Sequence, residues 1–101
     1  MLKPKYGCND YANAFKNDVQ FHLVLYSKSH NGEIVFLTGK DLDSGETHCY
    51  REGSGGLLPI YEKFLNNDTL LKDKGSYQVV LKRRDSTLTL PFICSGKSFK
   101  N

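Results

Sequence analysis

Residues 76–94 read SYQVVLKRRDSTLTLPFIC, and this stretch shows the clearest architecture in the chain. Two runs rich in β-branched residues and leucine flank a charged turn at residues 82–85. Alternation places Tyr77, Val79 and Leu81 on one side of the first run, and a matching apolar set follows on the second. The stretch therefore predicts a β-hairpin with a basic tip.

Pro91 interrupts the second run of this hairpin. Proline has no N–H group to donate within a sheet, so it is confined to edge strands, strand ends and bulges. We therefore expect the last strand to lie at a sheet edge or to contain a bulge near Pro91.

Three further strands are expected upstream of the hairpin. Residues 19–28 alternate, with Phe21, Leu23 and Leu25 on one side, and apolar residues on both sides indicate a central strand. Asn31-Gly32 is a turn signal before a strand at residues 34–38, and we expect a connection of four or five residues there. A shorter strand is expected at residues 46–51.

Two segments have helical patterns. Residues 9–17 predict a short helix, because Tyr11, Ala14 and Phe15 fall on one helical face. Residues 58–66 predict the main helix, with Pro59 in its first turn and a wide apolar stripe on one side. Leu70-Leu71 are expected to add a last helical turn.

The predicted fold is one α+β domain spanning residues 1–101, with residues 1–8 and 97–101 flexible. It contains a single antiparallel sheet of about five strands, the main helix packed on one face and a short N-terminal helix. The expected core consists of Phe21, Leu23, Leu25, Ile60, Phe64, Val79 and Leu81.

The composition narrows the class of protein. The net charge is +3, a smaller basic excess than most nucleic-acid binders show. No apolar run is long enough for a signal peptide or a membrane span, and the cysteines Cys8, Cys49 and Cys94 are odd in number without CxxC spacing. We therefore expect three reduced thiols, a cytoplasmic location and no membrane partner.

The basic hairpin is the first candidate binding site. Lys82, Arg83 and Arg84 at its tip can reach phosphates, and Tyr77 or Tyr26 can stack on bases. A charged hairpin tip is also an ordinary solvated surface, and Asp85 offsets part of its charge. Binding of RNA or single-stranded DNA is therefore an alternative function.

The loop Gly53-Ser54-Gly55-Gly56 is a weak candidate for an anion site, because it lies between an expected strand and an expected helix. It lacks the Gly-Lys-Ser/Thr ending of a phosphate-binding loop, and Pro59 removes one N–H donor from the helix start. A flexible turn that lets the helix pack onto the sheet is the preferred interpretation of its composition.

Histidine and cysteine chemistry has little support in the pattern. His48 and Cys49 are neighbours on an expected strand, so their side chains point to opposite faces and cannot pair as base and nucleophile. Cys49 would need His22 or His30 from another strand, and a metal site from His22, His48 and a cysteine has no defining spacing. We expect no cofactor and no metal.

These observations favour a small non-enzymatic protein-binding module that acts as a regulator, inhibitor or accessory subunit. The expected sheet edge and the abundant tyrosines suit an interface with another protein, and an edge-strand dimer is a further alternative. A small enzyme using His48 or a cysteine is the weaker alternative.

Overall fold

The computed structural model describes residues 7–53, 55–94 and 96–99. Its elements in chain order are α1 (Cys8–Asp18), β1 (Phe21–Asn31), β2 (Ile34–Asp41), β3 (Thr47–Glu52), the 3₁₀ helix η1 (Leu58–Lys63), β4 (Thr69–Lys72), β5 (Val79–Arg83), β6 (Ser86–Leu90), β7 (Phe92–Cys94) and β8 (Lys97–Phe99). The predicted α+β class with an antiparallel sheet is confirmed.

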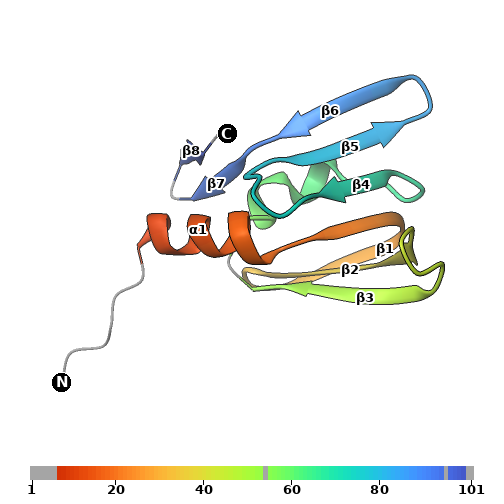
Figure 1. Ribbon diagram of the computed structural model, residues 1–101, viewed down its shortest axis with the longest axis horizontal. Coiled ribbons are helices and arrows are strands. Elements are labelled where there is room, and N and C mark those ends of the chain that lie inside the picture. The colour runs from red at the N-terminus through yellow and green to blue at the C-terminus, as the bar shows by residue number, and fades with distance from the viewer. Residues whose placement is uncertain (1–6, 54, 95, 100–101) are drawn as a thin grey trace.

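The main sheet has six antiparallel strands in the order β3-β2-β1-β4-β5-β6 (Figure 1). Strands β1–β3 and strands β4–β6 are two three-stranded meanders. They join where β1 pairs with β4, in a register that sets Phe21 opposite Lys72 and Val24 opposite Thr69. The prediction that β1 is a central strand is therefore confirmed.

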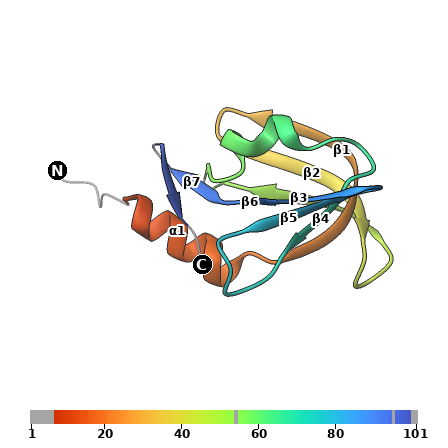
Figure 2. The same cartoon turned by 90° about the horizontal axis from the view of Figure 1, so that it is seen from above.

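One face of the sheet, here called the inner face, carries the core. Alternation along β1 buries Phe21, Leu23 and Leu25, as predicted, and every other expected core residue is buried as well. η1 lies over this face (Figure 2), while α1 lies at one end of the sheet beside β7 (Figure 1). The Phe15 ring joins α1 to the core, with its centroid 5.0 Å from that of Phe92.

The predicted main helix at residues 58–66 is shorter and tighter than expected. Ile60 and Phe64 donate backbone hydrogen bonds three residues back, to Leu57 and Tyr61, which is the 3₁₀ pattern. The helix ends at Lys63, and Leu65, expected on the apolar stripe, is 54% exposed. Asn67 then turns the chain with a positive φ of 75°, so that it can enter the sheet.

The prediction that Leu70-Leu71 would extend this helix is wrong. Both residues belong to β4, where Leu70 pairs with Leu23 on one side and with Leu81 on the other. Four residues are too few for their alternation to be distinguished from a helical turn. The pairing with two longer strands decides their conformation, because it buries Leu70 completely.

Lys72 ends β4 with a fully buried side chain, which the pattern did not reveal. Its Nζ donates to the backbone carbonyls of Lys16 (3.3 Å), Val19 (2.9 Å) and Asp73 (2.6 Å), and it lies 4.9 Å from the Phe15 ring centroid. Two of these carbonyls belong to the C-terminal end of α1 and its cap, so the ammonium fastens α1 to the sheet. Burial lowers the pKa of Lys72 to about 8.

The prediction of an edge strand near Pro91 is confirmed, but the predicted strand is divided at this residue into β6 and β7. β6 stops at Leu90 and is an edge strand, and after Pro91 the chain forms β7, which pairs with β8 in a separate two-stranded sheet. Residues 97–99, expected to belong to a flexible tail, form β8. The Phe99 ring packs 5.7 Å from those of Phe92 and Tyr77, which explains the ordering. Residues 1–6 and 100–101 lie outside the described residues.

The connection between β1 and β2 is also tighter than predicted. Asn31 pairs directly with Ile34, which leaves a two-residue turn in place of the expected four or five residues. Gly32, with a φ of 60°, occupies the first position of this turn. Two-residue hairpin turns with a positive φ there match the twist of the flanking strands, so Ser29 and His30 remain in β1.

The prediction of three reduced cysteines is wrong. Cys8 at the start of α1 and Cys94 at the end of β7 form a disulfide with their Cα atoms 5.7 Å apart. Spacing along the chain could not show this, because 86 positions separate the two residues. Cys49 is the third cysteine and is free and exposed.

Replacing Phe64, which is fully buried, should test the placement of η1. Phe64→Ala should lower the free energy of unfolding by about 3–5 kcal/mol, because it removes a buried ring and leaves a cavity. The matched control is Leu65→Ala, which should change the stability by at most about 0.5 kcal/mol because Leu65 is exposed. Urea denaturation measures both, and equal effects would contradict this packing.

The disulfide can be tested by counting thiols. The denatured, unreduced protein should react with a thiol reagent at Cys49 alone, and the reduced protein should react at all three cysteines. Reduction should also lower the free energy of unfolding by about 2–5 kcal/mol, in the Cys49→Ser variant as in the parent protein. Three reactive thiols before reduction would show that Cys8 and Cys94 are not bonded.

Candidate functional site

An ion pair with Asp68 neutralises Arg83, one of the three cations of the basic hairpin tip. Arg83 donates from Nε to Asp68 Oδ1 (2.9 Å) and from Nη2 to Asp68 Oδ2 (3.2 Å), and Nη2 also donates to the backbone carbonyl of Lys63. The Asp68 side chain is only 5% exposed, and its Oδ2 accepts the Leu65 N–H at 2.8 Å. Arg83 therefore holds the segment between η1 and β4 in place.

The other residues of the predicted basic site do not form one patch. Lys82 and Arg84 are exposed beside the tip. Tyr77 precedes the opposite end of β5, where its ring packs against Phe99 and lies under the Lys16 ammonium at 4.9 Å. Tyr26 is 47% exposed on β1, and β4 lies between it and the hairpin.

The glycine loop has a clear structural role at one position. A Cβ atom on Gly56 would overlap the Phe92 ring, so glycine is required for the loop to pack against β7. A Cβ on Gly55 would lie 3.3 Å from the Glu33 carboxylate, a charge that disfavours anions. Gly53 is exposed, Ser54 lies outside the described residues, and the six residues of η1 form too short a helix for a strong dipole.

Strand β6 is the most exposed uncharged edge among the described strands. Its sequence, STLTL at residues 86–90, contains no charged residue, and all of it except Leu90 is exposed. The opposite edge strand, β3, carries His48, Arg51 and Glu52. Natural sheets protect their edges with charges, prolines or bulges, and within β6 itself none of these occurs.

A shallow hollow of ≈ 460 Å³ adjoins this edge. It lies between η1 and the β5–β6 hairpin and is lined by Pro59, Glu62, Lys63, Leu65, Arg83 and Leu88. Leu65 and Leu88 are 54% and 38% exposed, so the hollow presents two leucine side chains to solvent. The sequence pattern did not reveal this feature, because it predicts Leu65 on the apolar stripe of a longer helix.

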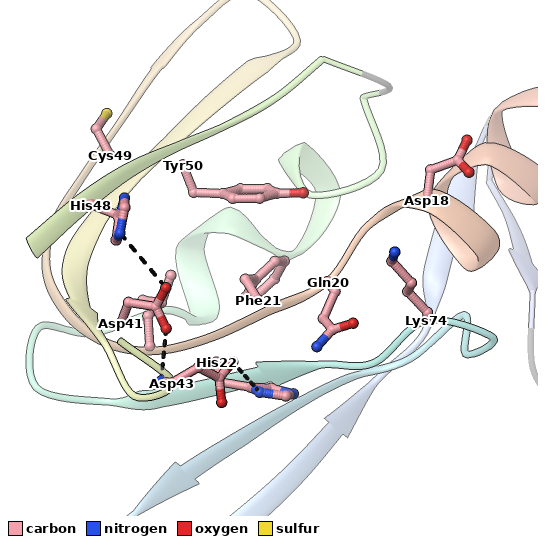
Figure 3. Close-up of a pocket in the computed structure, with 11 residues that line it drawn as sticks. Asp18, Gln20, Phe21, His22, Asp41, Asp43, His48, Cys49, Tyr50 and Lys74 are labelled. Carbon is pink, nitrogen blue, oxygen red and sulfur yellow. Dashed lines mark hydrogen bonds and ion pairs between the residues drawn. The ribbon is translucent and has the colours of Figure 1, made fainter. Parts of the chain in front are cut away.

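A second cavity, of ≈ 440 Å³, opens beside the first residues of β1 (Figure 3). The Phe21 and Tyr50 rings, with centroids 5.0 Å apart, lie between a group of histidines and aspartates and Lys74. His22 contacts Asp43 and Asp73 through its two ring nitrogens, and His48 lies 3.8 Å from Asp41.

Among the described residues of this cavity, His48 and Cys49 do not form a base–nucleophile pair. His48 faces Asp41, while the Cys49 sulfur points away from the His48 ring (Figure 3), as the alternation along a strand requires. No group of three histidine, cysteine or carboxylate side chains in the described part of the chain is arranged to hold a metal ion.

Comparison of the chain with protein-family models, with curated proteins and with solved structures gave no match. None of the helices within the described ranges is long and apolar enough to cross a membrane.

The two arginines of the hairpin tip should behave differently when replaced. Arg83→Ala should lower the free energy of unfolding by about 1–3 kcal/mol, because it leaves the buried Asp68 carboxylate without its charged partner. Arg84→Ala should change it by at most about 0.5 kcal/mol. Urea denaturation of the two variants measures both values, and an Arg83→Ala protein as stable as Arg84→Ala would show that the ion pair is unimportant.

Proposed function

We propose that the protein is a non-enzymatic protein-binding module that captures an extended segment of its partner along strand β6. The proposal rests on one observation: an exposed, uncharged edge strand adjoins a hollow that presents Leu65 and Leu88. An extended peptide can add a strand to such an edge, with main-chain hydrogen bonds supplying affinity and side-chain pockets supplying specificity.

The geometry of β6 suits this mode of binding. In an antiparallel ladder, alternate residues bond to one neighbouring strand, so the remaining residues of β6 direct their N–H and C=O groups away from β5. Leu88 pairs with Leu81 and therefore lies on the inner face, where the hollow begins. A peptide strand beside β6 would place alternate side chains over Leu65 and Leu88, and apolar side chains would gain most from burial there.

The small number of exposed cations at the hairpin tip favours a protein partner over nucleic acid. The ion pair between Arg83 and Asp68 leaves Lys82 and Arg84 as the exposed cations of the tip, with Asp85 beside them. Two separated cations give weak, salt-sensitive contact with phosphates. The module would act by occupying a strand of its partner, as a regulator, inhibitor or accessory subunit does.

The disulfide indicates the type of compartment in which the protein would bind such a partner. The expectation of a cytoplasmic location depends in part on three reduced thiols, whereas Cys8 and Cys94 are bonded. Structural disulfides persist in oxidising compartments and are rare in the cytosol. We therefore infer that the protein works in an oxidising compartment.

The experiment is selection of extended peptides from a random dodecapeptide library, followed by titration of the selected peptides. Leu88→Glu should weaken binding by about tenfold or more, since it places a charge in the hollow. Leu42→Glu is the matched control, because Leu42 is another exposed leucine but lies in the β2–β3 turn. Amide exchange should show new protection at alternate residues of β6.

Other outcomes would replace the proposal. Selected peptides that protect β3, or that bind both glutamate variants equally, would place the binding surface elsewhere. Sub-micromolar binding of single-stranded RNA at about 150 mM salt, abolished by Lys82→Ala with Arg84→Ala, would favour nucleic acid instead. Arg83 is left intact in this test because it also stabilises the fold.

A further inference from the structure

His22 lies between two carboxylates that come from different parts of the chain. Its Nδ1 is 3.0 Å from Asp43 Oδ2 in the turn between β2 and β3, and its Nε2 is 2.6 Å from Asp73 Oδ1 in the loop after β4. Its side chain is 22% exposed. The ring therefore bridges the two meanders of the sheet at the end where β1 begins.

Both contacts can be hydrogen bonds only when the ring is protonated. An imidazolium donates from both nitrogens, whereas neutral imidazole has one donor and one acceptor. The acceptor nitrogen of a neutral ring would face a carboxylate at hydrogen-bonding distance, which is repulsive. Because the contact with Asp73 is the shorter one, a neutral ring retains its proton on Nε2 and loses the contact with Asp43.

The surroundings of His22 favour its protonated state and raise its pKa above that of an ordinary histidine. The hydrogen bond that His22 donates to Asp73 raises the pKa of His22 above its usual 6.5, burial opposes this, and the hydrogen bond to Asp43 and its charge raise the pKa further. The other charged groups around the cavity are Asp41, which faces His48, together with Asp18 at the end of α1 and Lys74 in the loop after β4. Asp41 and Asp18 favour a cation, and Lys74 opposes it.

We propose that His22 is a pH-sensitive clamp that ties the β2–β3 turn to the loop after β4, and that loss of its proton releases the turn beside the ≈ 440 Å³ cavity. The release widens access to the Phe21 and Tyr50 rings that form the cavity wall. This inference does not depend on peptide binding at β6, because β6 and the Leu65–Leu88 hollow are lined by other residues.

The sign of the pH dependence follows from linkage. In the unfolded chain His22 has a pKa near 6.5, and in the folded protein its pKa is higher. The clamp therefore contributes its full stabilisation below about pH 6.5 and loses it as the pH rises through the folded value. The β2–β3 turn should be held in mildly acidic solution and released in alkaline solution.

The test combines NMR titration of His22 with amide exchange of the turn. Both ring nitrogens should be protonated at about pH 5.5, and His22 should titrate above 6.5. The amides of Leu42 and Gly45, which donate to His22 and Asp41 carbonyls, report on the turn. Their exchange, corrected for the intrinsic pH dependence, should rise about two- to fivefold between about pH 5.5 and about pH 8.5, because the two carboxylates are exposed.

Three variants separate the clamp from general effects of pH. Asp43→Asn should lower the pKa of His22 and make exchange of the turn independent of pH, and His22→Gln should remove the pH dependence entirely. His48→Gln is the control, because His48 does not contact Asp43 or Asp73 in the described structure, and it should keep the pH-dependent rise. Titration of His22 at or below 6.5, or a pH-dependent rise that persists in Asp43→Asn, would overturn the proposal.

Discussion

The pairing of β1 with β4 is the interaction on which the rest of the structure depends. Each half of the main sheet is a meander whose hairpins connect neighbours in sequence, and such hairpins form locally. The two meanders meet in four residue pairs, from Phe21 opposite Lys72 to Val24 opposite Thr69. A three-stranded meander alone leaves most of its apolar face exposed, so the common core under η1 exists only because this seam forms.

Three polar side chains with several hydrogen bonds lie in or next to the paired strands β1 and β4: Asp68, Lys72 and His22. Asp68 precedes β4 and binds Arg83, which places the start of the strand. Lys72 ends β4 and fastens α1 through the backbone carbonyls of Lys16 and Val19. His22, which pairs with Leu71 across the seam, bridges the carboxylates of Asp43 and Asp73. Asp68 and Lys72 are buried groups that would be costly to leave unpaired beside the core, whereas the carboxylates that His22 contacts are exposed. Of these groups, His22 joins the two meanders, because Asp43 lies in the β2–β3 turn and Asp73 follows β4.

The local features of the fold were predictable from sequence, and the features set by distant partners were not. The β5–β6 hairpin, the burial of one side of β1 and the edge position imposed by Pro91 each follow from a period of two or from the chemistry of one residue. β4, the Cys8–Cys94 disulfide and the burial of Lys72 depend on segments brought together by the fold. A four-residue strand and three cysteines carry no signal of those contacts along the chain.

The candidate sites show the same division. The sequence shows the basic tip, but it does not show the partner that neutralises Arg83, because Asp68 precedes a strand for which the pattern predicts a helical turn. The uncharged character of β6 could be read from STLTL, whereas the hollow beside it required knowing that the 3₁₀ helix stops before Leu65. Pro91 follows β6, and the outer side of β6 has no neighbour among the described strands.

The most direct test of this account is an NMR measurement of contacts across the β1–β4 seam. The account predicts extended-strand chemical shifts for Leu70 and Leu71, together with cross-strand nuclear Overhauser effects that link β4 to residues 21–24 of β1 and to residues 80–82 of β5. Helical shifts at Leu70 and Leu71, with no contacts to β1, would contradict it. That result would separate the two meanders and remove the common core.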